Sequence, residues 1–245
     1  MRDPAATAPA RGMRIAVIVP LYNTRAYITA AVDSILAQTR PADEIVVADD
    51  GSTDGSADLL AGYAPRVRVI RLPHAGSATA LNRGIGETTG DAIAFLDADD
   101  LWANDKLERQ ESVLLAEPDV DCVFGLVQQF SQGGGARTLR EPQPGVSRIG
   151  LLIRRTAFER FGLFDATLQV ADFVPWYVHA VAAGLKVRML EHVVAHRRIH
   201  DGNSGITRRD QQQQESLLGL KRALDLRRRR SHPAPSEDGK ARDQD

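Results

Sequence analysis

Three short apolar runs in the first hundred residues each end abruptly in polar loop residues. The runs span residues 15–19, 45–48 and 93–96, and the loops after them begin at Pro20, Asp49 and Asp97. Short apolar runs closed by turn residues are typical of strands that are buried on both faces of a parallel sheet. Ligands of open parallel sheets bind beyond the carboxyl ends of the strands. We therefore expect these three loops, distant in sequence, to converge on one crevice.

Helical patterns alternate with the strands. Apolar side chains at helical spacing occur in residues 26–38, 58–63, 78–86, 156–161 and 173–183, and further strands are predicted at 67–70 and 149–153. This order predicts an α/β fold with a mostly parallel central sheet and helices on both faces. Residues 131–146 are rich in Gly and Pro, which predicts an irregular surface segment.

The strand at 93–96 delivers three carboxylates, Asp97, Asp99 and Asp100, to one point. Crowded acids repel one another unless a metal ion or a donor-rich ligand neutralises them. Oxygen ligands suit Mg²⁺ or Mn²⁺, which complete their coordination with waters and phosphate oxygens. The segment therefore indicates a metal and a phosphorylated substrate. The alternative is an acidic surface turn, or a cap on a helix that begins near Asn104.

Composition excludes several classes of protein. The 245 residues are 43% hydrophobic and 26% charged, which is ordinary for one globular α/β domain. A formal charge of -1 offers no general attraction to nucleic acid. The single cysteine, Cys122, excludes an internal disulfide. No apolar run approaches the roughly twenty residues of a membrane span, so the sequence predicts a cytoplasmic protein without a transmembrane segment.

Composition also predicts four segments. Residues 1–12 are expected to be a disordered leader and 13–205 the folded domain, followed by a helical segment with a basic end at 206–230 and a disordered tail at 231–245. Four consecutive arginines close the helical segment, at positions 227–230. They either make weak peripheral contact with anionic lipid or remain solvated.

Four ordered strings identify a family. They are IAVIVPLYN at 15–23, EIVVADDGSTDGS at 44–56, GSATALNRGIGETTGDAIAFLDADD at 76–100 and RRTAFERFGLFD at 154–165. In order and spacing they resemble the family 2 glycosyltransferases, and the match covers about residues 14–204. The resemblance implies the GT-A (nucleotide-diphospho-sugar transferase) fold. It also implies a metal-dependent, inverting transferase that moves a sugar from a nucleoside-diphosphate sugar, UDP-linked, to an acceptor.

The resemblance assigns the donor to the loops after the strands. Asp50 would contact the base, and Asp97, the first acid of the DxD motif, the ribose or donor sugar. Asp99 would coordinate Mn²⁺ or Mg²⁺ together with His200. The remaining expected nucleotide contacts are Pro20, Tyr22, Asn23, Asn82 and Arg198.

Some of these assignments keep alternatives. The alternative for Asp50 is helix capping or turn formation with Gly51 and Ser52. Which of Arg197 and Arg198 faces inward depends on strand register. The Arg that commonly precedes Asn82 in the family is Leu81 here.

An inverting transfer needs a base within reach of the acceptor nucleophile. The family places a Glu-Asp pair at the start of a helix after the FGLFD turn, and this chain has Ala171 and Asp172. Asp172 is therefore the expected general base, and a helix N-cap is the alternative reading.

Two other functions remain open on the sequence. The first is a catalytically inactive GT-A domain that serves as a binding or scaffold partner in a glycan or natural-product pathway. Ala171 and Leu81 favour it, and the intact carboxylates oppose it. The second, a sugar-phosphate nucleotidyltransferase, needs an early Gly-rich phosphate loop, and residues 20–23 offer none. The acceptor, whether glycan, lipid-linked, peptide or small metabolite, stays unidentified.

Overall fold

The computed structural model describes residues 12–133, 136–168, 172–201, 203, 213–215, 217 and 221. Its strands are β1 (Ile15–Leu21), β2 (Glu44–Asp49), β3 (Arg68–Arg71), β4 (Ala92–Phe95), β5 (Leu101–Trp102), β6 (Cys122–Gly133), β7 (Ala136–Leu139), β8 (Gln143–Pro144), β9 (Leu152–Arg154) and β10 (Val187–Ile199). Its α-helices are α1 (Ile28–Leu36), α2 (Ser77–Gly86), α3 (Lys106–Ala116), α4 (Arg155–Phe161) and α5 (Phe173–Ala182). Two 3₁₀ helices are η1 (Ala57–Tyr63) and η2 (Arg148–Gly150).

The strands of this part of the chain form one sheet in the order β3-β2-β1-β4-β9-β6-β10-β5, with β7 and β8 added to β6. Strands β3, β2, β1 and β4 are parallel neighbours, and β6 is parallel to β10. Strand β9 lies antiparallel between β4 and β6, so these two run in the same direction. The predicted α/β fold with a mostly parallel sheet is confirmed.

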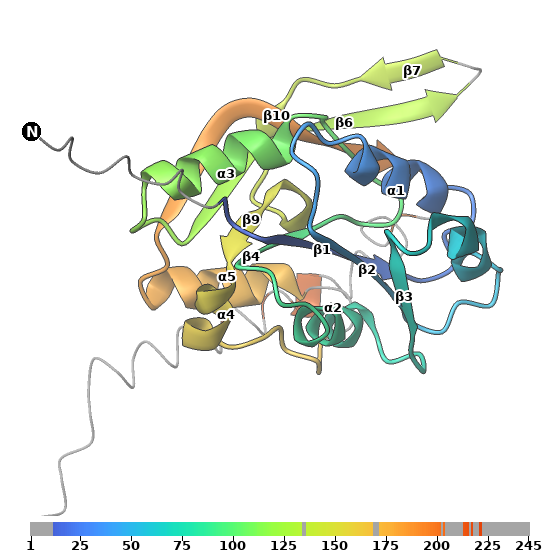
Figure 1. Cartoon of the computed structure of the whole chain (residues 1–245), viewed down its shortest axis with the longest axis horizontal. Coiled ribbons are helices and arrows are strands. Elements are labelled where there is room, and N and C mark those ends of the chain that lie inside the picture. Colours follow the sequence, from blue (N-terminus) through green and yellow to red (C-terminus); the bar gives the residue numbers. More distant parts are fainter. Residues whose placement is uncertain are drawn as a thin grey trace, which may run out of the picture.

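Helices cover both faces of the sheet, as predicted. Figure 1 shows α1 and α3 on one face and α2, α4 and α5 on the other. Along β1 the side chains alternate, so that Val17 and Val19 pack with the α1 side and Ile18 with the α2 side. Because both faces of β1 are buried, the strand reads as a continuous apolar run.

Aromatic rings fill the core beneath β4. Phe95 lies 6.1 Å from Phe158 and 5.8 Å from Phe164 between ring centroids, both edge to face. Trp176 packs on the same cluster, is 5% exposed, and donates its Nε1–H to the carbonyl of Gly162 at 2.7 Å. Trp176 is therefore a core residue of α5.

Three buried side chains hold the backbone of η2 and the residue after it. The bonds run from Trp102 Nε1 to the Ile149 carbonyl at 3.1 Å, from Gln110 Nε2 to Gly150 at 2.8 Å and from Lys106 Nζ to Leu151 at 3.0 Å. Three consecutive carbonyls thus find donors from β5 and α3. This seating fixes η2, the element that begins with Arg148.

The segment predicted to be irregular contains regular structure. Strand β6 extends to Gly133 and pairs antiparallel with β7, with Phe130 opposite Leu139. The pair forms a hairpin that projects from the body (Figure 1). The prediction was wrong because the ladder uses backbone groups, which Gly supplies as well as any residue. The expected strand at 149–153 is likewise η2 followed by the shorter β9.

Helix α2 approaches β1 closely at one glycine. A Cβ added at Gly84 would lie 2.5 Å from Ile18 Cγ2, whereas a Cβ at Gly86, in the same helix, meets nothing within 4 Å. Gly84→Ala is expected to lower the free energy of unfolding by about 1–3 kcal/mol, because the core must shift to admit it. Gly86→Ala is the control and should be neutral or stabilising. Urea unfolding of both variants checks this, and equal effects would contradict the close packing.

Several predictions fall outside the described residues. The leader, apart from its last residue, the arginines at 227–230 and the tail all lie there, as does most of the helical segment at 206–230. Within the described part of the chain, no helix has the length and apolar character needed to cross a membrane.

Candidate functional site

The loops after β1 and β2 are joined by hydrogen bonds. Asn23 donates its backbone N–H to Ser52 Oγ at 3.0 Å, and its side-chain Oδ1 accepts from the Thr53 N–H at 2.8 Å. Asn23 has φ 49°, a left-handed conformation that Asn tolerates better than most residues. The parallel pairing of β1 with β2 and β4 brings all three loops to one edge of the sheet.

The second loop presents a buried carboxylate and a ring pair. Asp50 is 3% exposed, and its two oxygens accept backbone N–H groups from Ala75 at 2.8 Å and Gly76 at 2.9 Å. The His74 Nδ1 lies 2.9 Å from Asp50 Oδ2. The His74 ring stacks on Tyr22 with centroids 4.2 Å apart and 17° between the planes. Tyr22 remains 42% exposed, so this stack is open to a planar ligand.

The third loop pairs with the far end of β10. Asp99 Oδ2 lies 3.0 Å from His200 Nε2 and accepts Asn203 Nδ2–H at 3.2 Å. The backbone N–H of His200 donates to Asn203 Oδ1 at 2.7 Å. Tyr27 lies against the His200 ring, 4.6 Å between centroids. A carboxylate and an imidazole separated by 101 residues therefore face each other.

Asp99 and His200 are the side chains that could hold a divalent cation. Among the described residues, no group of three or more His, Cys, Asp or Glu side chains converges. Asp99 and His200 offer two ligands, and Mg²⁺ commonly takes few protein ligands plus phosphates and waters. Burial, followed by the charges of Asp99 and Asp97, raises the pKa of Asp100 well above its ordinary value. Burial and the charges of Asp99 and Asp97 therefore disfavour a third negative charge at Asp100.

Arg198 lies inside the site, and Arg197 is exposed. The Arg198 backbone N–H donates to Asp100 Oδ1 at 2.7 Å, and its Nε donates to the Asp99 carbonyl at 2.9 Å. The guanidinium carbon lies 5.0 Å from the Tyr27 ring centroid and 4.6 Å from that of Phe130. The register of β10 thus decides between the two arginines.

Arg148 connects two of the carboxylates that the sequence singled out. Its Nε donates to Asp97 Oδ1 at 2.7 Å, and its Nη1 to Asp172 Oδ1 at 2.5 Å. The exposed fractions of the Asp97, Arg148 and Asp172 side chains are 31%, 18% and 1%. Burial lowers the pKa of Arg148, but the charges of Asp172 and Asp97 and their hydrogen bonds outweigh it, and the pKa is raised above its usual range. Arg148 is therefore a permanent cation between two acids.

Asp172 does not act as a capping side chain. It occupies the N-cap position of α5, yet makes no side-chain capping bond. Its Oδ1 is taken by Arg148, and its Oδ2 is buried with no hydrogen-bond partner in the part of the chain that the structure describes. A buried carboxylate oxygen without a hydrogen-bond donor is rare in proteins.

Comparison with known proteins identifies the family. The sequence model described as "Glycosyl transferase family 2" matches residues 16–194. The chain belongs to glycosyl transferase family 2. A relative from Bacillus subtilis strain 168, the putative teichuronic acid biosynthesis glycosyltransferase TuaG, is 43% identical over 114 residues, which are 45% of this chain and 44% of that protein. The uncharacterized glycosyltransferase EpsJ of the same strain is 29% identical over 206 residues, 72% of this chain and 58% of that protein.

Solved structures of S. aureus TarS share the fold. The crystal structure of S. aureus TarS 1–349 in complex with UDP-GlcNAc has a TM-score of 0.65 and 21% sequence identity, and the match covers 78% of this chain and 60% of that one. The complex of the same protein with UDP has a TM-score of 0.63, also at 21% identity, covering 77% and 61%. The predicted GT-A fold is confirmed. This chain spans less than two thirds of the length of TuaG, EpsJ and TarS 1–349.

Two residues that were expected to contact the nucleotide, Asn82 and Pro20, have structural roles in the fold. Both ends of the Asn82 amide bond the backbone of Phe164, with Nδ2 donating at 2.9 Å and Oδ1 accepting at 3.1 Å. Asn82 therefore ties α2 to the turn before α5. Pro20 lies within β1, opposite Ala48 of β2, instead of ending the strand.

Sequence reasoning missed His74 and Arg148. His74 follows β3 by three residues, so its place after a parallel strand was a usable signal. Arg148 follows the Gly- and Pro-rich segment and carries no mark in the sequence that separates it from other arginines.

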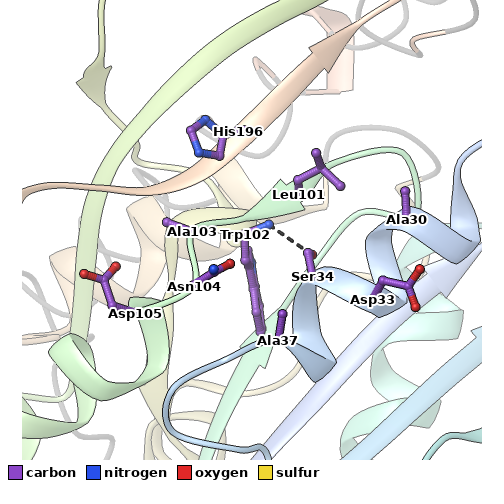
Figure 2. A pocket seen from close by; sticks show the side chains of 10 residues that line it. All are labelled: Ala30, Asp33, Ser34, Ala37, Leu101, Trp102, Ala103, Asn104, Asp105 and His196. Atoms are coloured by element: carbon purple, nitrogen blue, oxygen red, sulfur yellow. Dashed lines mark hydrogen bonds between the residues drawn. The ribbon is translucent and has the colours of Figure 1, made fainter.

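A surface hollow of about 810 Å³ lies between α1, β5 and β10. Figure 2 shows Trp102 standing between Ser34 on one side and Asn104 on the other, with His196 above. None of the predicted site residues is among the residues that line it.

Proposed function

We propose that this chain is a metal-dependent, inverting glycosyltransferase that transfers a sugar from a UDP-linked donor to an acceptor hydroxyl. The observation that carries the proposal is the buried Asp172 carboxylate, linked through Arg148 to Asp97, two residues before Asp99. A base and a metal-binding acid beside one nucleotide loop are the parts that such a transfer needs.

The donor would lie along the edge formed by the three loops. Tyr22 and His74 offer a ring stack for the base, and Asp50 keeps lone pairs for a base N–H beyond those that hold residues 74–76. Asp97 would bind the ribose or the donor sugar. The described neighbours in the fold were crystallised with UDP and UDP-GlcNAc, which supports a uridine donor.

Asp99 and His200 would hold Mn²⁺ or Mg²⁺. Such an ion supplies Lewis-acid stabilisation of the charge on a departing nucleoside diphosphate. Arg198, packed beside Asp99, adds a fixed positive charge near this position.

Asp172 would act as the general base. It takes the proton of the acceptor hydroxyl while the acceptor oxygen bonds to the anomeric carbon and the diphosphate leaves from the opposite face. One displacement of this kind inverts the anomeric centre. The cytoplasmic location stays a prediction of the sequence, and the acceptor is not identified.

Nucleotide binding tests the proposal. In thermal unfolding with Mn²⁺ and UDP, GDP or dTDP, we expect UDP to stabilise the protein by about 2.7 kcal/mol at a hundred times its dissociation constant. For a domain of this size the melting temperature then rises by roughly 5–11 °C. Asp99→Ala and chelation of the metal should each remove the shift.

Asp119→Ala is the matched control, because the Asp119 side chain is 90% exposed and forms a surface ion pair with Lys186. It should retain the UDP-dependent shift. No shift with any of the three nucleotides at millimolar concentration would contradict the proposal and favour an inactive GT-A domain that serves as a scaffold.

A further inference from the structure

Arg148 is the residue at which the donor loop and the proposed base meet. We propose that Arg148 is a positioning residue that holds Asp172 Oδ1, so that Oδ2 is the atom offered to the acceptor hydroxyl. This inference rests on the proposed function, since it assumes that Asp172 is the base. It assigns to Arg148 a role in transfer without any contact with the reacting atoms.

The geometry of the guanidinium supports this role. Nε bonds Asp97 and Nη1 bonds Asp172, so two nitrogens of one rigid plane serve two different carboxylates. Because the fork is planar, fixing one bond fixes the direction of the other. Asp97, which lies on the loop after β4, thereby anchors the orientation of a carboxylate 75 residues away in sequence.

The charges explain why an arginine stands here. Asp172 is 1% exposed, and a buried carboxylate without a cation carries a large desolvation cost. Arg148 compensates Oδ1. Oδ2 is left buried without a partner among the described residues, which is costly unless a donor arrives. An acceptor O–H supplies that donor, so the unsatisfied oxygen marks the direction of substrate approach.

The element that carries Arg148 is itself fixed by hydrogen bonds. It is the first residue of η2, and Trp102, Gln110 and Lys106 bind three carbonyls in or directly after this element. Because buried hydrogen bonds fix the three residues that follow Arg148, its side chain starts from a rigid element. The position of Arg148 is thus set by side chains of β5 and α3.

During transfer Arg148 keeps its protons. The acceptor O–H proton moves to Asp172 Oδ2, the acceptor oxygen bonds to the anomeric carbon, and the bond to the diphosphate breaks with its electron pair on the leaving oxygen. Arg148 only keeps Oδ1 turned away from the acceptor. Its effect therefore passes through Asp172 and vanishes when Asp172 is replaced.

A double-mutant cycle on the full chain tests this dependence. Arg148→Met, Asp172→Asn and the double variant are compared by UDP release from UDP-GlcNAc with Mn²⁺. Arg148→Met is expected to lower kcat by about 10–100-fold while the dissociation constant of UDP changes by less than about threefold. The double variant should be no slower than Asp172→Asn, and Arg148→Lys should recover part of the loss. Multiplying effects, or an unchanged kcat in Arg148→Met, would overturn the inference.

Arg160→Met is the matched control. Arg160 bonds the buried Asp121 at 2.5 Å. The substitution therefore removes an Arg–Asp pair of the same length that lies away from the site. It should leave kcat unchanged. If the wild-type chain binds UDP but does not release UDP from UDP-GlcNAc, the melting temperatures of the same four proteins are compared instead. Additive changes in melting temperature for Arg148→Met and Asp172→Asn would overturn the inference that Arg148 holds Asp172. Absence of nucleotide binding by the wild-type chain would instead count against the proposed function.

Discussion

Replacement of Asp172 by asparagine is expected to slow sugar transfer by about 10²–10⁴-fold, the usual contribution of a general base. The substitution keeps the shape of the side chain and a group that Arg148 can bond, but removes the ability to take a proton. Binding of UDP should persist, because Asp172 is not among the residues proposed to bind the nucleotide. The measurements are UDP release and the UDP-dependent rise in melting temperature on the same preparation.

The matched control for this variant is Asp121→Asn. Asp121 is also buried and bonded to an arginine, Arg160, but it precedes β6 at the amino end. Since β6 runs in the same direction as β4, this end is opposite the site. Asp121→Asn should cost stability and leave the rate per folded molecule unchanged. Full activity of Asp172→Asn would show that another group accepts the proton.

Gln110→Ala is expected to lower the free energy of unfolding by about 3–5 kcal/mol. Gln110 is fully buried, and its Nε2 donates to the carbonyls of Val123 at 2.9 Å and Gly150 at 2.8 Å. Its Oε1 accepts from Lys106 Nζ at 2.5 Å. Burial lowers the pKa of Lys106 well below its ordinary value, and loss of the Gln110 acceptor would disfavour its charged form further. Alanine would leave several buried polar groups unpaired beside a cavity.

Thermal unfolding measures this cost, and the melting temperature should fall by roughly 6–20 °C. Gln128→Ala is the control, because Gln128 makes one hydrogen bond, to the Arg140 carbonyl, at the surface. Its effect should stay within about 0.5 kcal/mol. Activity at a temperature where Gln110→Ala is still folded should also fall, because Gly150 belongs to the element that carries Arg148. Similar stability losses in the two variants would contradict the seating of η2.

The core of the fold could be read from local pattern. The runs at 15–19, 45–48 and 93–96 are apolar because both faces of their strands are covered, and β1, β2 and β4 appear where these runs predict. The positions of α1, α2, α4 and α5 followed from the spacing of apolar residues in the same way, whereas α3 was not predicted from its spacing. The hairpin of β6 and β7 did not, because a backbone ladder at an edge leaves a weak trace in the side chains.

Within the site, residues directly after buried strands were the predictable ones. Asp50, Asp97 and Asp99 follow β2 and β4, and parallel strands bring their carboxyl ends to one edge whatever the detailed packing. Arg198 required the register of β10, since a shift of one residue would have placed Arg197 inside. Asp172 required the observation that its side chain bonds Arg148 instead of capping α5.

The amino-acid sequence by itself determined the family, the alternation of strands and helices from β1 to β4, and the loops that carry the acids, because these depend on local periodicity and on motifs contiguous in the chain. Only the tertiary structure decided that Arg148 lies between Asp97 and Asp172, and that the Asn82 amide bonds the backbone of Phe164. These contacts span 51, 24 and 82 residues. Their partners meet only after the sheet has assembled and η2 has been seated on α3, so no local pattern encodes them.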